Sequence, residues 1–303
     1  MIYVGVDGGG TKTKLVAYEN DTLISEAIVG PCNYNFIGVD AAVNTLFDGV
    51  NALNISLSKI AAIGIGDPSI DDDAPVALDS PTNQFVKKLK SKLDLPIFIR
   101  SDAYMALFAL TRGEAPAALI LSGTGSMGIA EDANKTIHIV GGWGRLIGDE
   151  GSGYFIALEG IKAALQAIDG VGQPTALVEE LVGYFNVQKP RDLIRVFYQD
   201  AAPDIASFSR IVSNCALQGD KVAKGILLQA AKCLSLYACS LLKQSGASLL
   251  GVYGSVICND AIVRNEFERL VKSHFPNIHI QEPPMAPEYA AALYAQKNFN
   301  LIS

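Results

Sequence analysis

The sequence predicts an α/β protein built from two domains, and three observations support this prediction. The chain has 303 residues, which is more than one small hydrophobic core accommodates. Strand-like apolar runs alternate with helical patterns along most of its length. An apolar run that ends in a loop of small residues also occurs twice, at 2–11 and at 117–126. Because both halves open in this way, we predict two α/β domains that face each other across a central cleft.

The first half reads as three strands followed by alternating helices and strands. We expect strands at 2–6, 14–18, 22–29, 60–65 and 97–100, and helices at 39–53, 82–93 and from Ser101 or Asp102 to about Arg112. Either Ser101 or Asp102 could cap the last of these helices, and Gly113 ends it.

The second half repeats the opening and then becomes mainly helical. We expect strands at 117–121, 127–130, 136–140, 248–253 and 278–280, a helical region over 152–243, and helices at 260–273 and 288–297. The helix at 221–243 carries one polar stripe on an otherwise apolar cylinder, so most of it is predicted to be buried.

Composition excludes several classes of partner. The formal net charge of −7 argues against nucleic acid and against an anionic membrane surface, since both need a basic patch. No uninterrupted apolar run approaches the length of a membrane span, and a first strand starting at Ile2 leaves no room for a signal segment. The five cysteines and three histidines have no metal-ligand spacing. We therefore expect a cytoplasmic protein with reduced thiols and no zinc or iron site.

The first small-residue loop suggests a phosphate site. Asp7 ends the first strand and is followed by Gly8, Gly9, Gly10 and Thr11. Glycines let the backbone approach a ligand closely, and consecutive N–H groups in such a turn attract anions, to which Thr11 and Thr13 could add hydroxyl donors. Asp7 is placed to hold a hydrated Mg²⁺ beside the anion. The alternative is a hairpin turn, because 14–18 reads as a second strand.

The second small-residue loop, Ser122–Ser126, lies at the equivalent point of the second half. Gly123, Thr124 and Gly125 could therefore grip the same polyphosphate from the opposite side. Taken alone, such a motif is often only a tight turn, so its matching position is what favours the functional interpretation.

Asp102 is the candidate catalytic base. It follows the predicted strand at 97–100, where a carboxylate facing the phosphates could deprotonate a substrate hydroxyl. Phosphoryl transfer needs little more from a protein than positioning, metal and charge neutralisation. The alternative is an N-cap, which would stabilise the helix by about 1 kcal/mol. Because Ser101 could serve as that cap, Asp102 is available for chemistry.

The glycine-rich segment 141–153 contains Trp143, the only tryptophan. An aromatic face beside polar donors suits a sugar ring, so Gly142, Trp143 and Asp149 are candidate sugar contacts. The alternatives are a hinge wedge for Trp143 and a helix cap for Asp149.

Two further loops carry weaker signals. Asn33 lies in the loop after the third strand, where asparagine is common for conformational reasons alone. Gly254 and Ser255 follow the strand at 248–253 and could approach a nucleotide base or ribose, or form a generic strand-to-helix turn.

Together these segments resemble the BadF/BadG/BcrA/BcrD-type ATPases, specifically the N-acetylglucosamine kinase branch, within the actin, Hsp70 and sugar-kinase superfamily. The matching segments are Gly5–Thr11, Cys32–Asn33, Ser101–Ala103, Ser122–Ser126, Gly141–Gly144, Gly148–Ser152, Gln218–Asp220 and Tyr253–Val256. The resemblance implies two ribonuclease-H-like (actin-like ATPase) domains around a central cleft. The first, for sugar and phosphate, would comprise 1–112 plus 288–303, and the second, for the nucleotide, 113–287.

The resemblance also implies an ATP- and Mg²⁺-dependent kinase that phosphorylates the 6-hydroxyl of N-acetylglucosamine, with glucosamine or N-acetylmuramate as alternative substrates. Asp102 would be the base and Asp7 the metal-binding residue. The implied phosphate and nucleotide contacts are Gly8, Gly9, Gly10, Thr11, Gly123, Thr124, Gly125, Ala216, Gly254 and Ser255. The implied sugar contacts are Asn33, Asp102, Gly142, Trp143 and Asp149. One departure concerns the loop after the fourth strand, which borders the sugar site in this family and here carries Asp67 and Pro68 instead of glycine and alanine.

Two other classes are compatible with parts of the pattern. A BadF-type ATPase activator without a sugar substrate would share both loops, but it holds an iron–sulfur cluster through paired cysteines that have no counterpart here. A sugar-sensing regulator would add a DNA-binding helix-turn-helix ahead of the first strand, where there is no room. We expect a small-molecule amino sugar as partner and a homodimer, although the residues themselves do not define the oligomeric state.

Overall fold

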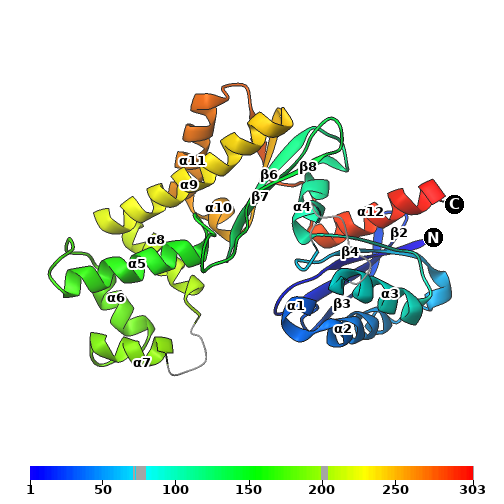
Figure 1. Ribbon diagram of the computed structural model, residues 1–303, viewed down its shortest axis with the longest axis horizontal. Coiled ribbons are helices and arrows are strands. Elements are labelled where there is room, and N and C mark those ends of the chain that lie inside the picture. Colours follow the sequence, from blue (N-terminus) through cyan, green and yellow to red (C-terminus); the bar gives the residue numbers. More distant parts are fainter. Residues whose placement is uncertain (71, 73–79, 199–203, 303) are drawn as a thin grey trace. The chain divides into compact units, whose positions relative to one another are not determined.

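The computed structural model describes residues 1–70, 72, 80–198 and 204–302, which form two compact units (Figure 1). Unit 1 consists of Met1–Ala115, Lys135–Ile137 and Pro283–Ser303, and unit 2 of Pro116–Asn134 and His138–Glu282. Each unit contains one five-stranded mixed sheet flanked by helices. The predicted α/β class with two domains of similar architecture is confirmed.

The sheet of unit 1 has the strand order β3-β2-β1-β4-β5. These strands are β1 (Ile2–Asp7), β2 (Thr13–Glu19), β3 (Thr22–Val29), β4 (Ile60–Gly66) and β5 (Ile97–Arg100). The first three are antiparallel neighbours, whereas β1, β4 and β5 run parallel. Asp7 pairs with Gly66, and Gly66 pairs with Arg100. The carboxyl ends of the three parallel strands are therefore level with one another.

Helices cover both faces of this sheet. They are α1 (Tyr34–Ile37), α2 (Val39–Ala52), η1 (Leu57–Lys59), α3 (Pro81–Leu93), α4 (Asp102–Thr111) and α12 (Pro287–Ile302). Because successive strand residues point to opposite faces, Val4 and Val6 of β1 pack in the core cluster beneath α2 and α3, and Tyr3 packs against α12. The last helix thus belongs to unit 1, although it is far from the other elements in sequence.

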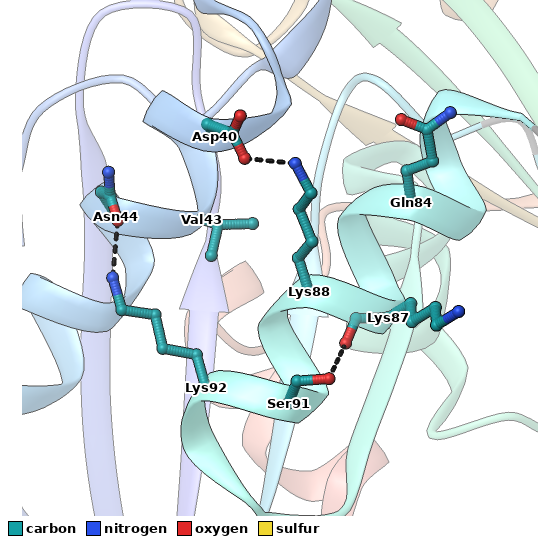
Figure 2. A pocket seen from close by; sticks show the side chains of 8 residues that line it. All are labelled: Asp40, Val43, Asn44, Gln84, Lys87, Lys88, Ser91 and Lys92. Atoms are coloured by element: carbon teal, nitrogen blue, oxygen red, sulfur yellow. Dashed lines mark hydrogen bonds and ion pairs between the residues drawn. The ribbon is translucent and has the colours of Figure 1, made fainter.

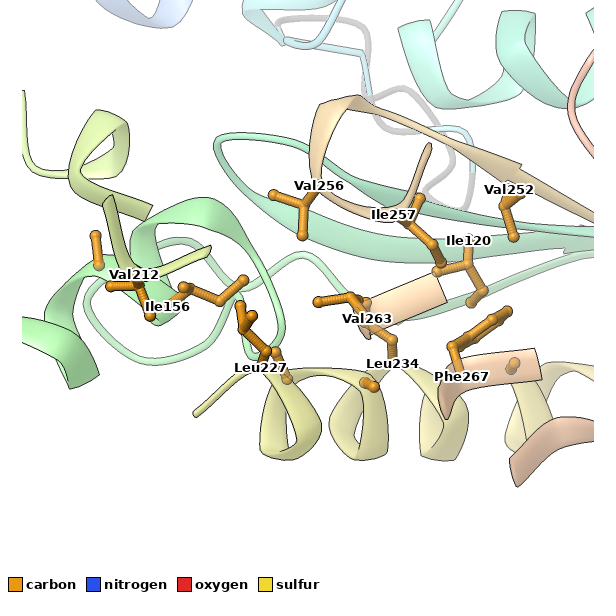
Figure 3. Close-up of a cluster of buried hydrophobic side chains, with 14 of the residues drawn as sticks. Ile120, Ile156, Val212, Leu227, Leu234, Val252, Val256, Ile257, Val263 and Phe267 are labelled. Atoms are coloured by element: carbon orange, nitrogen blue, oxygen red, sulfur yellow. The ribbon is translucent and has the colours of Figure 1, made fainter. Parts of the chain in front are cut away.

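The sheet of unit 2 has the order β10-β9-β6-β7-β8. Its strands are β6 (Ala117–Ser122), β7 (Ser126–Glu131), β8 (Ile137–Gly141), β9 (Leu249–Tyr253) and β10 (His279–Gln281). The helices are α5 (Gly153–Ile168), α6 (Leu177–Tyr184), η2 (Pro190–Asp192), α7 (Leu193–Tyr198), η3 (Ala206–Phe208), α8 (Ser209–Leu217), α9 (Lys221–Ser245), α10 (Ser255–Asn259) and α11 (Ala261–His274). Figure 3 shows the core of this unit, where Leu234 of α9 and Phe267 of α11 lie beneath Ile120 and Val252 of the sheet.

Helix α9 is amphipathic rather than mostly buried. Ten of its 25 residues are buried. The prediction that most of this helix is buried is therefore wrong, because the exposed stripe is wider than the sequence pattern indicated. Among the described residues, α9 is the one helix long and apolar enough to cross a membrane by length and composition, a test that a core helix also passes. The buried face of α9 forms part of the core of unit 2.

Most predicted elements lie within two residues of the observed ones, and the exceptions are local. The short helices α1 and α10 were not expected, and α12 continues to Ile302 instead of ending near residue 297. Helix α10 begins directly after Gly254, whose φ of +107° redirects the chain from β9 into a helical turn.

Candidate functional site

Three aspartates lie at the carboxyl edge of the parallel strands in unit 1. Asp7 is the last residue of β1, Asp67 directly follows β4, and Asp102 is the first residue of α4 after β5. The strand register places the three strand ends side by side. Their charges interact, since Asp102 raises the pKa of Asp7 and Asp67 raises that of Asp102.

Asp102 is not the cap of α4. The Ser101 hydroxyl accepts a hydrogen bond from the Tyr104 N–H at 2.9 Å, so Ser101 occupies the N-cap position. The Asp102 Oδ1 atom accepts from the Ala103 N–H at 2.8 Å. The pKa of Asp102 is raised to about 6, mainly by burial; the Ala103 N–H lowers it and the charges of Asp67 and Asp72 raise it. A carboxylate with such a pKa is suited to accept a proton near neutral pH.

Asp7 has the chemistry of a magnesium ligand. Its pKa is raised to about 6, first by burial and then by the charges of Glu288 and Asp102, while the charges of Lys12 and Lys14 lower it. A bound cation would relieve this repulsion. No group of three His, Cys, Asp or Glu side chains in the described part of the chain could hold a metal ion alone. As a single carboxylate, Asp7 fits Mg²⁺, which is usually held by one or two carboxylates together with water and phosphate oxygens.

The loop after β1 presents two free backbone N–H groups, those of Gly10 and Thr11. The Gly8 N–H is already bonded to the Gly66 carbonyl at 2.7 Å. The Gly9 N–H donates to the Cys32 sulfur, whereas the N–H groups of Gly10 and Thr11 have no acceptor among the described residues. An anion would thus be bound by the Gly10 and Thr11 N–H groups. Gly8 is required for its lack of a side chain, since a Cβ there would lie 2.6 Å from the Cys32 sulfur. Thr13 was expected to add a hydroxyl, but its side chain is fully buried within β2.

In unit 2, the second small-residue loop lies beside the turn after β9. A Cβ on Gly254 would lie 2.5 Å from the Ser122 carbonyl oxygen, and one on Gly123 would lie 3.9 Å from the Ser255 nitrogen. The Gly123 and Thr124 carbonyls accept hydrogen bonds from Gly153 and Tyr154 at the start of α5. The fold therefore brings together the predicted phosphate residues of Ser122–Ser126 and the predicted nucleotide residues Gly254 and Ser255.

The glycine-rich segment 141–153 packs along this same loop. The Gly142 N–H donates to the Ser126 carbonyl at 3.1 Å. Asp149, in a left-handed conformation with φ of +60°, accepts from the Ser126 and Gly144 N–H groups, and burial raises its pKa. Ser152, not Asp149, caps α5. Trp143 is 73% exposed and thus not part of a core.

The predicted sugar contacts are divided between the two units. Asn33 and Asp102 lie in unit 1, whereas Gly142, Trp143 and Asp149 lie in unit 2. Within unit 2, Asp149 borders Gly125, where a Cβ would lie 3.0 Å from the Asp149 Oδ2 atom.

A cavity of about 490 Å³ opens in unit 2 next to Ser255. Its lining comes from α5, α8, α10 and α11 and from adjoining turns: Ile156, Ser209, Arg210, Ser213, Asn214, Leu217, Ser255, Val256, Asn259, Asp260 and Ala261. The predicted contact Ala216 lies instead in the core cluster, 6% exposed. Its neighbours Asn214 and Leu217 face the cavity. The sequence did not single out Asn214 or Leu217, for which the only signal is the amphipathic pattern of α8.

A second cavity, of about 690 Å³, lies between α2 and α3 in unit 1 (Figure 2). Two of its lysines join the two helices, since Lys88 donates to Asp40 and Lys92 to Asn44. None of the predicted site residues lines it. Helix pairing thus explains the side chains of Lys88 and Lys92.

The comparison with known families agrees with this arrangement. Residues 4–295 match the model of the BadF/BadG/BcrA/BcrD ATPase family. The chain belongs to this family. The predicted family is therefore confirmed, and membership of an ATPase family supports the use of ATP.

Individual relatives cover nearly the whole chain. The N-acetylmuramic acid/N-acetylglucosamine kinase of Clostridium acetobutylicum is 29% identical, and the N-acetyl-D-glucosamine kinase of Dictyostelium discoideum is 27% identical. Each alignment covers 97% of this chain and 97% of the relative. The crystal structure of a putative N-acetylglucosamine kinase from Porphyromonas gingivalis has the same fold, with a TM-score of 0.74 at 18% identity over 99% of this chain and 100% of that one. The predicted actin-like fold class is confirmed by this likeness.

Proposed function

We propose that this chain is an ATP-dependent amino-sugar kinase that phosphorylates the 6-hydroxyl of N-acetylglucosamine. The observation that carries the proposal is Asp102, a partly buried carboxylate at the carboxyl edge of the sheet whose capping role is taken by Ser101. The names of the two relatives, both kinases of N-acetylated amino sugars, support the substrate class. The alternatives are glucosamine and N-acetylmuramate.

In this proposal, Asp102 accepts the proton of the sugar hydroxyl as that oxygen attacks the terminal phosphate of ATP. The free N–H groups of Gly10 and Thr11 bind phosphate oxygens, beside Gly8 and Gly9, the other phosphate contacts that the sequence predicts. Mg²⁺, held by Asp7 when bound, supplies charge neutralisation on the phosphates.

The nucleotide is assigned to unit 2. Ser122–Ser126 and Gly254 would bind phosphate and ribose, and the cavity beside Ser255 would take the adenosine, with Ser213 and Asn214 as polar contacts. Asn33, Gly142, Trp143 and Asp149 remain the proposed sugar contacts. The homodimer, the cytoplasmic location and the absence of nucleic-acid and membrane partners stay predictions from the sequence.

A substrate panel tests the proposal directly. In an ATP-coupled assay with N-acetylglucosamine, glucosamine, N-acetylmuramate and glucose, we expect at least one amino sugar to be phosphorylated, and N-acetylglucosamine with the highest kcat/KM. Phosphorus NMR of the product should show a 6-phosphate. ATP hydrolysis that proceeds at the same rate without any sugar would contradict the kinase proposal and favour an ATPase activator.

The raised pKa of Asp102 predicts the pH dependence of the reaction. Because the base must be ionised and its pKa is about 6, kcat/KM for the sugar should be constant above about pH 7 and fall about tenfold per pH unit well below 6. Asp7 titrates in the same range when no cation is bound, so the assay should be run with saturating Mg²⁺ and ATP.

The fall in activity at low pH should not come from unfolding caused by protonation of Asp7 and Asp102. Both carboxyl groups have folded pKa values above the ordinary value of 3.8, so their contribution to stability is fully present below about pH 4 and is lost as the pH rises through 6. Circular dichroism at pH 5 should therefore show a folded protein. A rate that does not change between pH 5 and 8 would exclude Asp102 as the base.

A further inference from the structure

Asp67 is a fully buried carboxylate, 0% exposed, to which the proposed chemistry gives no role. Its Oδ1 atom accepts from the Ser69 N–H at 2.8 Å, and its Oδ2 atom accepts from the Cys32 thiol at 3.2 Å. Burial raises the pKa of Asp67, and the hydrogen bonds from Ser69 and Cys32 lower it. A buried carboxyl group is costly unless its oxygens are bonded, and here both oxygens bond to residues that surround Asn33.

Through these bonds Asp67 joins two loops to β5. Cys32 directly precedes Asn33 in the loop after β3, and Ser69 belongs to the loop after β4. The Ser69 hydroxyl donates to Asn33 Oδ1 at 3.0 Å. The Asp67 N–H donates to the Arg100 carbonyl at 3.0 Å, two residues before Asp102. Asn33 is thus held by the same short network that adjoins the proposed base.

This network fixes the orientation of the Asn33 amide. Its Oδ1 atom accepts from the Asn35 N–H at 3.0 Å as well as from Ser69. A backbone N–H can only donate, so the atom that faces it must be the oxygen of the amide. Two donors occupy the lone pairs of that oxygen, and Nδ2 has no acceptor among the described residues. An atom without a partner is either fully buried or accessible to solvent. Asn33 Nδ2 is not one of the fully buried ones, so it is accessible to solvent. Asn33 can therefore offer a ligand only N–H donors.

We propose that Asp67 is a positioning residue of the sugar site, which acts through Ser69 and Cys32 to hold Asn33 as a hydrogen-bond donor to an oxygen of the sugar. This inference rests on the proposed function for the contact between Asn33 and the sugar. The acceptor on the sugar is a hydroxyl or an acetamido carbonyl oxygen. The ammonium group of an unacetylated amino sugar cannot serve, because it has no lone pair to accept the bond.

The test compares Asp67→Asn and Ser69→Ala with the wild type in steady-state kinetics of the full chain. Asp67→Asn replaces the acceptor that faces Cys32 by an NH₂ group, and Ser69→Ala removes the donor to Asn33. Since one oriented hydrogen bond is at stake, each should raise the KM for N-acetylglucosamine about threefold to tenfold. The kcat and the KM for ATP should change less than twofold. Asp48→Asn, on the exposed side of α2, is the matched control and should leave all three constants unchanged.

The decisive measurement repeats both substitutions in an Asn33→Ala background. If Asp67 and Ser69 act through Asn33, neither raises the sugar KM further in that background. Increases of equal size in both backgrounds, or an unchanged sugar KM in folded Asp67→Asn protein, would overturn the inference. If Asp67→Asn does not fold, Cys32→Ala and Ser69→Ala carry the same test. Wild-type protein that phosphorylates no sugar would overturn the proposed function, and this inference with it, whereas an active wild type with unaffected variants overturns this inference alone.

Discussion

Replacing Asp102 with asparagine is expected to lower kcat about 10²-fold or more while nucleotide affinity stays unchanged. Asparagine has nearly the same size and keeps an oxygen that can accept the Ala103 N–H, now at 2.8 Å from Asp102 Oδ1. It cannot take up a proton, so only the proposed base function is lost. Steady-state kinetics with N-acetylglucosamine measure kcat, and calorimetric titration with ATP and Mg²⁺ measures the nucleotide Kd.

The stability of the same variant distinguishes catalysis from folding. Because burial raises the pKa of Asp102 to about 6, the charged form is unfavourable in the folded state at pH 8, and removal of that charge should leave the Tm equal or higher. Ser101→Ala is the matched control. It removes the cap of α4, which should cost about 1 kcal/mol with little change in kcat. A near-normal kcat in Asp102→Asn, or a lower Tm at pH 8, would mean that Asp102 serves the structure instead.

The sequence predicts best those parts of the site that consist of consecutive residues. A strand that ends in Asp7 and three glycines predicts a loop with free N–H groups, and the N–H groups of Gly10 and Thr11 indeed lack an acceptor among the described residues. The sequence likewise limits the N-cap of α4 to two neighbouring residues, Ser101 and Asp102. The structure then assigned the cap to Ser101.

Contacts between distant residues could not be predicted in this way. The bond between Cys32 and Asp67 spans 35 positions, and it depends on how the loops after β3 and β4 meet. Only the unusual residue type at position 67 gave a signal. Ala216 shows the same limit within one helix, because a shift of one or two positions separates the core face of α8 from the residues that line the cavity. Thr13 was assigned to a loop although it begins β2, where its side chain points into the core.

The close approach of α12 to the sheet predicts a second large effect, on stability. Gly64 lies in β4, and a Cβ built there would lie 1.9 Å from the Ala291 carbonyl oxygen of α12. A Cβ built on Gly5 of β1 would lie at the same distance from the Glu288 carbonyl oxygen. Both obstacles are backbone atoms, so no side-chain rotation relieves the overlap. Gly64→Val should therefore displace α12 and lower the free energy of unfolding by about 3 kcal/mol or more.

Thermal and urea unfolding measure this effect, and a fall in Tm of about 10 °C is expected. Gly225→Ala is the matched control, because a Cβ there meets no atom within 4 Å. That change within α9 should leave the stability unchanged or raise it by up to about 1 kcal/mol, since alanine favours a helix more than glycine does. The displacement would also move Glu288, which raises the pKa of Asp7 and contacts Lys14 at 3.0 Å. A Gly64→Val protein as stable as the wild type would mean that α12 does not pack on β1 and β4, and the placement of 287–302 in unit 1 would then be wrong.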